Sequence, residues 1–294
     1  MKDFGELKKF YVKNYKKLMI IPFLILLFSL LVLGFWKVNT GSFVEKDVSL
    51  KGGYYISIRS DQEIDIDSFE KRMEESLGVD VSIKGISSLS GGRVGYGFEI
   101  EKVGGIQDIK SAIRDEGLDF GEDDLTVEEI SSALGASFLA STIKAVSFAI
   151  LFMSCVVFFY FRRLVPSGAV ILAAVSDLVG TLAIMNLLDI RLSTGAIAAL
   201  LMLLGYSVDS DILLSTKILK RIEGSLDERV FSAIKTGLTM QTTTLVALVV
   251  LYLGSNAIVL KKIALVLIIG LALDVVNTWL QNTGILKWYV EGKS

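Results

Sequence analysis

The chain has 294 residues, of which 52% are hydrophobic, and its mean hydropathy is +0.58. This composition predicts a membrane protein, and the formal net charge of −2 gives no reason to expect a nucleic-acid partner. Histidine is absent and Cys155 is the single cysteine, which excludes histidine-dependent catalysis, histidine metal sites and a disulfide within the chain. Since the sequence also lacks phosphate-loop, zinc and calcium motifs, we expect neither an enzyme nor a cofactor.

A basic tail precedes the first apolar run. Residues 1–17 carry six lysines, and residues 18–36 are almost entirely apolar. At about 1.5 Å per residue this run is long enough to cross a bilayer core, and no small-residue cleavage site follows it. The segment therefore predicts a permanent first transmembrane helix behind a cytoplasmic tail.

Residues 37–137 form a polar, charge-rich segment that differs in kind from the rest of the chain. Apolar residues alternate in four short stretches, as they do in strands, and two amphipathic stretches lie between them. The first predicted helix opens with a capping box at Asp67 and closes at Gly78, and the second ends at Gly117. The order β-α-β-β-α-β predicts an external α+β ferredoxin-like domain.

Five further apolar runs follow, so the predicted fold class is a membrane α-helical bundle of six transmembrane helices with the external domain between helices 1 and 2. The five runs lie within 138–282, at about 138–161, 165–187, 194–214, 238–254 and 262–282, and a cytoplasmic tail follows at 283–294.

The positive charges indicate the orientation of the bundle. The N-terminal lysines, Arg162 and Arg163, the basic segment 217–235 and the C-terminal lysines all fall on one side, which is then cytoplasmic. We expect a multi-pass protein of the cell membrane with both termini in the cytoplasm. Lys261 and Lys262 break this rule because they fall beside a short outer loop; either they reach outward to the interface or the last hairpin begins elsewhere.

Asp209 and Asp211 lie inside an otherwise apolar run. A carboxylate at the bilayer centre costs roughly 2.5–3.5 kcal/mol on insertion scales, so such a helix must face protein or water. Two residues on a helix are separated by about 200°, so the two acids face different surfaces. The alternative is that this helix protrudes and both acids lie in the cytoplasmic headgroup layer.

Asp177 and Asp274 add two more acids, in the third and sixth runs, and no lysine or arginine lies within the core of the last four runs. The four carboxylates must be protonated, hydrated, hydrogen-bonded or paired with another chain. We interpret Asp177, Asp209, Asp211 and Asp274 as a candidate proton relay; the alternative is a set of neutral acids that hold helices together.

Several short motifs follow one another in a specific order. They are Lys51-Gly52-Gly53 after Asp47, Leu134-Gly135, Ser176-Asp177, Gly205-Tyr206-Ser207-Val208-Asp209-Ser210-Asp211, Thr236-Gly237-Leu238-Thr239 and Ile263-Ala264-Leu265 with Ile269-Gly270. Together with the six-span layout, this series resembles the SecF family of the SecDF protein-export complex, over nearly the whole chain. The Asp-Ser-Asp form resembles the archaeal branch.

The resemblance implies the resistance-nodulation-division superfamily, a homologous six-span partner SecD, and work in the lipid membrane beside the Sec translocon channel on a translocating polypeptide. In the bacterial family the proton gradient is thought to move the external domains. The bacterial pattern has Asn-Asp-Thr where this chain has Asp209-Ser210-Asp211, so the family's acid aligns with Ser210, and its third-span His is Ser176 here. Two alternatives stay open: a scaffold that uses no gradient, and a half-size efflux transporter of the same superfamily.

Overall fold

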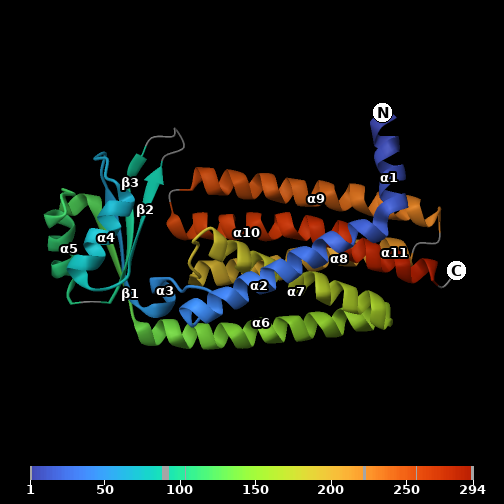
Figure 1. Ribbon diagram of the computed structural model, residues 1–294, viewed down its shortest axis with the longest axis horizontal. Coiled ribbons are helices and arrows are strands. Elements are labelled where there is room, and N and C mark those ends of the chain that lie inside the picture. Colours follow the sequence, from blue (N-terminus) through green and yellow to red (C-terminus); the bar gives the residue numbers. More distant parts are fainter. Residues whose placement is uncertain (1, 88–92, 103, 221–222, 256, 293–294) are drawn as a thin grey trace.

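The computed structural model describes residues 2–87, 93–102, 104–220, 223–255 and 257–292. They form an elongated bundle of helices with a small α/β domain at one end, and both termini lie at the opposite end (Figure 1). The long helices of the bundle are α2 (Ile20–Thr40), α6 (Ser132–Phe161), α7 (Leu164–Leu187), α8 (Thr194–Leu219), α9 (Leu226–Gly254) and α10 (Ile258–Val276).

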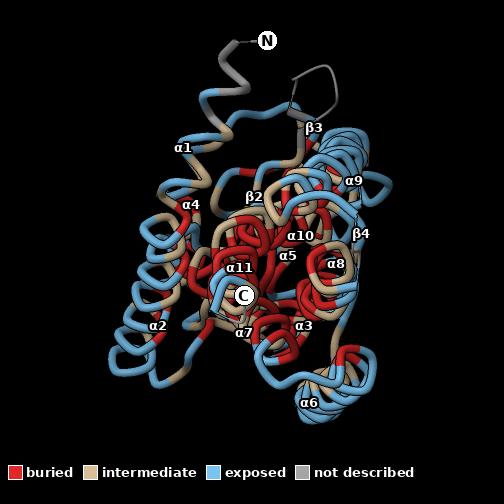
Figure 2. The backbone as a smooth tube through the Cα atoms, turned by 90° about the vertical axis from the view of Figure 1, so that its right-hand side faces the viewer, coloured by how far each residue is buried: buried red, intermediate tan, exposed pale blue. Residues whose placement is uncertain are grey.

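Five of these described helices, α2, α6, α7, α8 and α9, are long and apolar enough to cross a membrane. This finding confirms a membrane protein with several spans. Helix α10 also lies in the bundle against α7, α8 and α9, but its 19 residues include Lys261, Lys262 and Asp274. Burial is concentrated on α7, α8 and α10 in the centre, whereas α2 and α6 lie at the edge with exposed outer faces (Figure 2).

Two helices extend well beyond the predicted spans at the end of the bundle where the chain termini lie. Helix α8 continues to Leu219, and α9 begins at Leu226, twelve residues before the predicted start at 238. The early start of α9 follows from its capping box, in which Ser225 and Glu228 satisfy each other's backbone N–H groups. The hydropathy of a membrane span therefore underestimates the length of the helix that contains it.

The two chain ends are helical and packed together. Residues expected to be tails form α1 (Lys2–Leu18) and α11 (Thr283–Glu291), which are in contact. The Tyr11 hydroxyl donates to the carbonyl oxygen of Trp279 at 2.5 Å, and the buried Lys287 ammonium pairs with Asp227 at 2.5 Å. Aromatic and charged side chains thus dock both ends of the chain on the bundle.

The external domain has the element order β1 (Gly53–Arg59), α4 (Ile66–Leu77), β2 (Val81–Ser87), β3 (Arg93–Glu101), α5 (Ile106–Asp115) and β4 (Leu125–Ile130), with short helical turns at α3 (Val48–Lys51) and at η1 (Glu122–Asp124). The strands form one antiparallel sheet in the order β2-β3-β1-β4. Helices α4 and α5 cover the face turned away from the bundle (Figure 1), and Phe69, Phe98 and Tyr96 are buried between helices and sheet.

One detail of this domain differs from expectation. Helix α4 begins at Ile66 after Asp65, so the capping box expected at Asp67 is not the helix start. The Ser68 hydroxyl donates to Asp65 at 2.5 Å, and Asp67 lies in the first turn, where a negative charge is favourable.

Candidate carboxylate site in the helical bundle

Three of the four predicted acids meet in the centre of the bundle. Asp177 on α7, Asp211 on α8 and Asp274 on α10 are all buried, with at most 1% of each residue exposed. They come from the three most buried helices, so their positions depend on how those helices pack. The structure therefore brings together acids that are separated by up to 97 residues in the sequence (274 − 177).

Asp177 is held by two uncharged donors. The Ser207 hydroxyl donates to its Oδ2 at 2.6 Å, and the Asn277 amide donates to its Oδ1 at 2.7 Å. Ser207 itself is completely buried, one helical turn before Asp211 on the same side of α8. This contact gives the serine of the Gly-Tyr-Ser motif a role as a carboxylate partner.

Asp211 and Asp274 share a partner. The Thr278 hydroxyl lies 3.1 Å from Asp211 Oδ1 and 2.9 Å from Asp274 Oδ1. Asp211 Oδ1 also accepts from the Asn282 amide at 2.5 Å, and Asp274 Oδ2 accepts from the Gln241 amide at 2.6 Å. The two acids are therefore linked through a single hydroxyl.

A π-helix, η2 (Asn277–Asn282), supplies most of these donors. It continues directly from α10 into α11. Because backbone bonds in a π-helix run between residues five apart, Asn277 and Asn282 lie on nearly the same side and reach Asp177 and Asp211. The widened turn also leaves the Trp279 carbonyl to accept from Tyr11. A local irregularity of the last helix thus builds the site.

Trp279 and Gln241 set the position of Asp274. The indole Nε1 donates to Gln241 Oε1 at 2.7 Å, which orients the Gln241 amide toward the carboxylate. A Cβ at Gly237 would lie 2.2 Å from the Trp279 ring. The glycine of the Thr-Gly-Leu-Thr motif is therefore required by the close approach of α9 to this indole.

Each hydrogen bond described above to the three acids comes from a hydroxyl or an amide. Three carboxylates in one apolar interior cannot all be ionised without a counter-charge, since desolvation and mutual repulsion both oppose ionisation. Such a group can exchange protons as its surroundings change, which is the chemistry that a proton relay requires.

Asp209 is not part of this cluster. It is exposed and lines a groove of about 380 Å³ between α6 and α8, whose other lining side chains are apolar, among them Met153, Val157 and Ile212. The expectation that Asp209 and Asp211 face different surfaces agrees with the structure. Ser210 lies between them and turns inward, with its hydroxyl 3.5 Å from Asp274 Oδ2.

The remaining motif positions fall in three places. Gly205 and Tyr206 are exposed, with Gly205 on the groove that contains Asp209. Thr239 is exposed, and its hydroxyl bonds only to the Lys235 carbonyl of its own helix among the described residues. Asp47, Gly52 and Gly53 lie where the external domain meets the bundle, so they belong to a different site.

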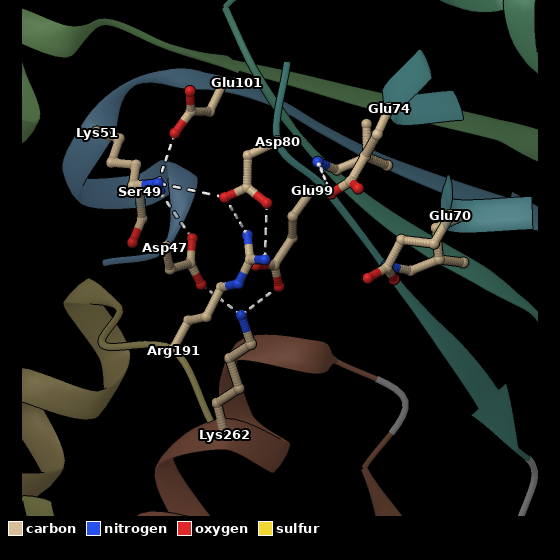
Figure 3. A network of polar contacts seen from close by, with 12 residues as sticks. Asp47, Ser49, Lys51, Glu70, Glu74, Asp80, Glu99, Glu101, Arg191 and Lys262 are labelled. Atoms are coloured by element: carbon tan, nitrogen blue, oxygen red, sulfur yellow. Dashed lines mark hydrogen bonds and ion pairs between the residues drawn. The ribbon is translucent and has the colours of Figure 1, made fainter. Parts of the chain in front are cut away.

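That junction is held by buried ion pairs (Figure 3). The Lys262 ammonium on α10 bonds to both Asp47 and Glu99, and all three side chains are at most 11% exposed. Asp47 also accepts the Ser49 backbone N–H at 2.8 Å as the N-cap of α3. Lys262, which broke the charge rule in the sequence, thus reaches out of the bundle into the external domain.

A second ion pair joins the same surfaces. Arg191, in the loop between α7 and α8, binds both oxygens of Asp80 at 2.8 and 2.9 Å. Gly53 has no room for a side chain because its Cβ would lie 2.2 Å from the Ile100 carbonyl, and the φ of Gly52 is +88°. These contacts explain the Asp-x-x-x-x-Gly-Gly pattern physically, as a cap, an ion pair and a close backbone approach.

The amides and the hydroxyl that hold the acids were not predicted from the sequence. Gln241, Asn277, Thr278 and Asn282 are all at most 3% exposed, and all bond to a carboxylate. The signal was present as a polar run, Asn277-Thr278 and Gln281-Asn282-Thr283, within an otherwise apolar segment. In a membrane helix such a run requires internal partners.

Comparisons with known proteins show the family of the chain. The family model for the protein export membrane protein SecD/SecF, C-terminal, matches residues 113–292. The protein-export membrane protein SecF of Methanocaldococcus jannaschii is 41% identical over 285 residues, which cover 95% of this chain and 97% of that protein. The SecF of Pyrococcus furiosus is 37% identical over 291 residues, covering 98% and 96%.

The chain belongs to the SecF family of protein-export membrane proteins.

The fold is also that of a solved SecDF. The crystal structure of SecDF from Thermus thermophilus, a translocon-associated membrane protein, superimposes with a TM-score of 0.75 at 17% identity. A SecDF in the super-membrane-facing form gives 0.58 at 18% identity. The two matches cover 95% and 96% of this chain but only 38% and 39% of those chains, so this SecF-family chain corresponds to a minor part of each SecDF polypeptide.

Proposed function

We propose that this SecF-family chain is an accessory subunit of the Sec protein-export machinery that pairs with a SecD homologue and assists polypeptide translocation, coupled to the proton gradient through Asp177, Asp211 and Asp274. It catalyses no covalent reaction. Six helices cross the membrane, α10 being the sixth, with a ferredoxin-like domain outside and both termini in the cytoplasm.

Two features of α10 support its role as the sixth span. Its lysine at 262 leaves the bundle to bind Asp47 and Glu99, so that charge lies at the junction and not in lipid. Its acid at 274 is buried and bonded to Gln241 and Thr278. Apart from Lys261 near its outer end, the other residues of the helix are apolar, as a span requires.

The observation that carries the proposal is the buried carboxylate group bonded to hydroxyls and amides. Burying acids in this way is costly, and natural membrane proteins keep such groups chiefly where protons, ions or substrates move. The shared Thr278 hydroxyl links Asp211 with Asp274, so a proton change at one acid alters the hydrogen bonding of the other.

The junction supplies a route from the acids to the external domain. Arg191 lies between α7 and α8, and Lys262 begins α10, so the ion pairs attach the domain to the same three helices that carry the acids. A rearrangement of these helices is therefore transmitted through charged contacts to the domain that meets the emerging polypeptide.

The test is export driven by an imposed proton gradient, measured as protease-protected substrate in vesicles that contain the Sec channel, the SecD homologue and this chain. We expect Asp177→Asn and Asp211→Asn to remove the gradient-dependent part of export, with the complex still assembled. Asp119→Asn, an exposed acid between α5 and η1 of the external domain, is the control and should behave as wild type.

Wild-type gradient dependence in both variants would contradict proton coupling by these acids. Export that requires the chain but never responds to the gradient would favour the scaffold instead. A self-associated chain that recovers no SecD homologue from native membranes would favour the half-size efflux transporter.

A further inference from the structure

A cavity of about 210 Å³ lies where the external domain meets the bundle. It is bounded by strand β2, by the loop between α7 and α8, and by the adjoining ends of α9 and α10. Lys84, Asp189, Tyr252, Lys261 and Lys262 lie in its wall, together with apolar residues from β2, from the loop between α7 and α8 and from α10. It is separate from the carboxylate site and from the groove that contains Asp209.

The wall of this cavity carries three lysines and a single acid, Asp189. Lys262 is already bonded to Asp47 and Glu99. No described residue forms a hydrogen bond or an ion pair with the Lys84 ammonium, and burial lowers the pKa of Lys84. Burial disfavours the charged form of a lysine that has no bonded acceptor. An anion that enters the cavity therefore stabilises the lysine ammonium.

The depth of the cavity in the membrane limits the kind of anion. It lies at the outer ends of α9 and α10, where the apolar bundle gives way to the polar domain, and this is the level of lipid headgroups. Leu188, Ile190 and Leu265 form the apolar part of the wall, and Tyr252 presents an aromatic ring with a polar end, as is common at membrane interfaces. Apolar and cationic walls together fit an amphiphile better than a free ion.

We propose that this cavity binds the phosphate ester of an outer-leaflet lipid headgroup, with Lys84 and Lys261 as its charged ligands and the apolar wall against the glycerol end of the acyl chains. The bound lipid then fills the space between β2 and the ends of α9 and α10, beside the ion pairs of Lys262. The two outer lysines that break the positive-inside rule have separate roles: Lys262 holds the domain, and Lys261 binds lipid. The proposal rests on the orientation given under the proposed function, with the α/β domain outside the membrane, and it does not depend on proton coupling.

The experiment uses the full chain in dodecyl maltoside, a detergent without phosphate, titrated with phosphatidylglycerol while bound lipid is counted by native mass spectrometry. Diacylglycerol, which has the same chains without the phosphate, and inorganic phosphate are the matched ligands. We expect one tightly bound phosphatidylglycerol and no comparable binding of either matched ligand.

Lys84→Gln and Lys261→Gln should each weaken phosphatidylglycerol binding by about tenfold, the effect of losing one hydrogen bond to a charged group. Lys102→Gln, on the same domain in an exposed pair with Glu129, is the control and should bind as wild type. Because bound lipid is counted on the folded fraction, a loss of stability alone does not mimic this result.

Equal phosphatidylglycerol affinity in the wild type and in a variant that combines Lys84→Gln with Lys261→Gln would overturn the proposal. Occupancy by inorganic phosphate that matches phosphatidylglycerol would also overturn it, since the cavity would then bind a free anion. Equal binding of diacylglycerol would overturn it as well, because the lysines would have no part in recognition.

Discussion

At the scale of single residues, Lys262 is the side chain on which the junction depends. Its ammonium lies between two buried carboxylates, Asp47 and Glu99; it bonds Glu99 Oε1, and Glu99 Oε2 has no hydrogen-bond partner among the described residues. Breaking a buried ion pair from one side costs far more than losing an exposed pair, because the acids left behind remain desolvated. The pair of Lys102 and Glu129, half exposed on both sides, provides the contrast.

Lys262→Gln should therefore lower the free energy of unfolding by about 3–5 kcal/mol, measured by chemical denaturation in detergent. Lys102→Gln should change it by less than about 1 kcal/mol. Adding Asp47→Asn and Glu99→Gln to Lys262→Gln should restore much of the loss, since no unpaired charge then remains. A Lys262→Gln effect as small as that of the exposed control would show that the junction is solvated.

At the scale of elements, the close approach of α9 to η2 positions the acid on α10. Gly237 allows Trp279 to lie against α9, and the indole orients Gln241 toward Asp274. Helix α10 approaches α8 in the same way, because a Cβ at Gly270 would lie 2.3 Å from Leu203. These glycines permit packing distances that alanine does not.

Gly237→Ala should thus destabilise the chain by about 1–3 kcal/mol and lower its thermal midpoint, because an indole ring must move to admit the methyl group. Gly168→Ala on α7 is the matched control, since nothing lies within 4 Å of a Cβ there, and alanine should stabilise that helix slightly. A Gly237→Ala protein as stable as wild type would mean that Trp279 has room to shift.

At the scale of the whole molecule, one side of the bundle combines large exposed apolar side chains with an exposed carboxylate. Helix α6 exposes large apolar side chains such as Phe152 and Phe159, and Asp209 lies in the apolar groove that α6 forms with α8. Because lipid does not hydrogen-bond a carboxylate, we propose that the SecD homologue covers this face and brings a hydrogen-bond donor to Asp209.

We expect Asp209→Ala to reduce recovery of the SecD homologue when a tagged chain is purified in mild detergent, while the isolated chain stays folded. Asp211 lies two residues further along α8 but is buried inside the bundle, so Asp211→Asn should leave the recovery of the SecD homologue unchanged. Full recovery with Asp209→Ala would place the partner on another face.

The sequence by itself determined the membrane class, the α/β domain, the order of elements and the family. Hydropathy runs and strand alternation are local patterns set by burial, and the ordered motifs occupy nearly the whole chain. It also showed that Asp209 and Asp211 must diverge, since helical rotation alone fixes that angle.

Only the tertiary structure decided which acids meet and what holds them. Asp177, Asp211 and Asp274 lie on different helices, and their partners depend on a π-helix that leaves no signal in hydropathy. The pairing of Lys262 with Asp47 and Glu99, and the bond of Tyr11 to Trp279, join residues more than 100 positions apart. Such contacts are set by how helices pack, which no local periodicity records.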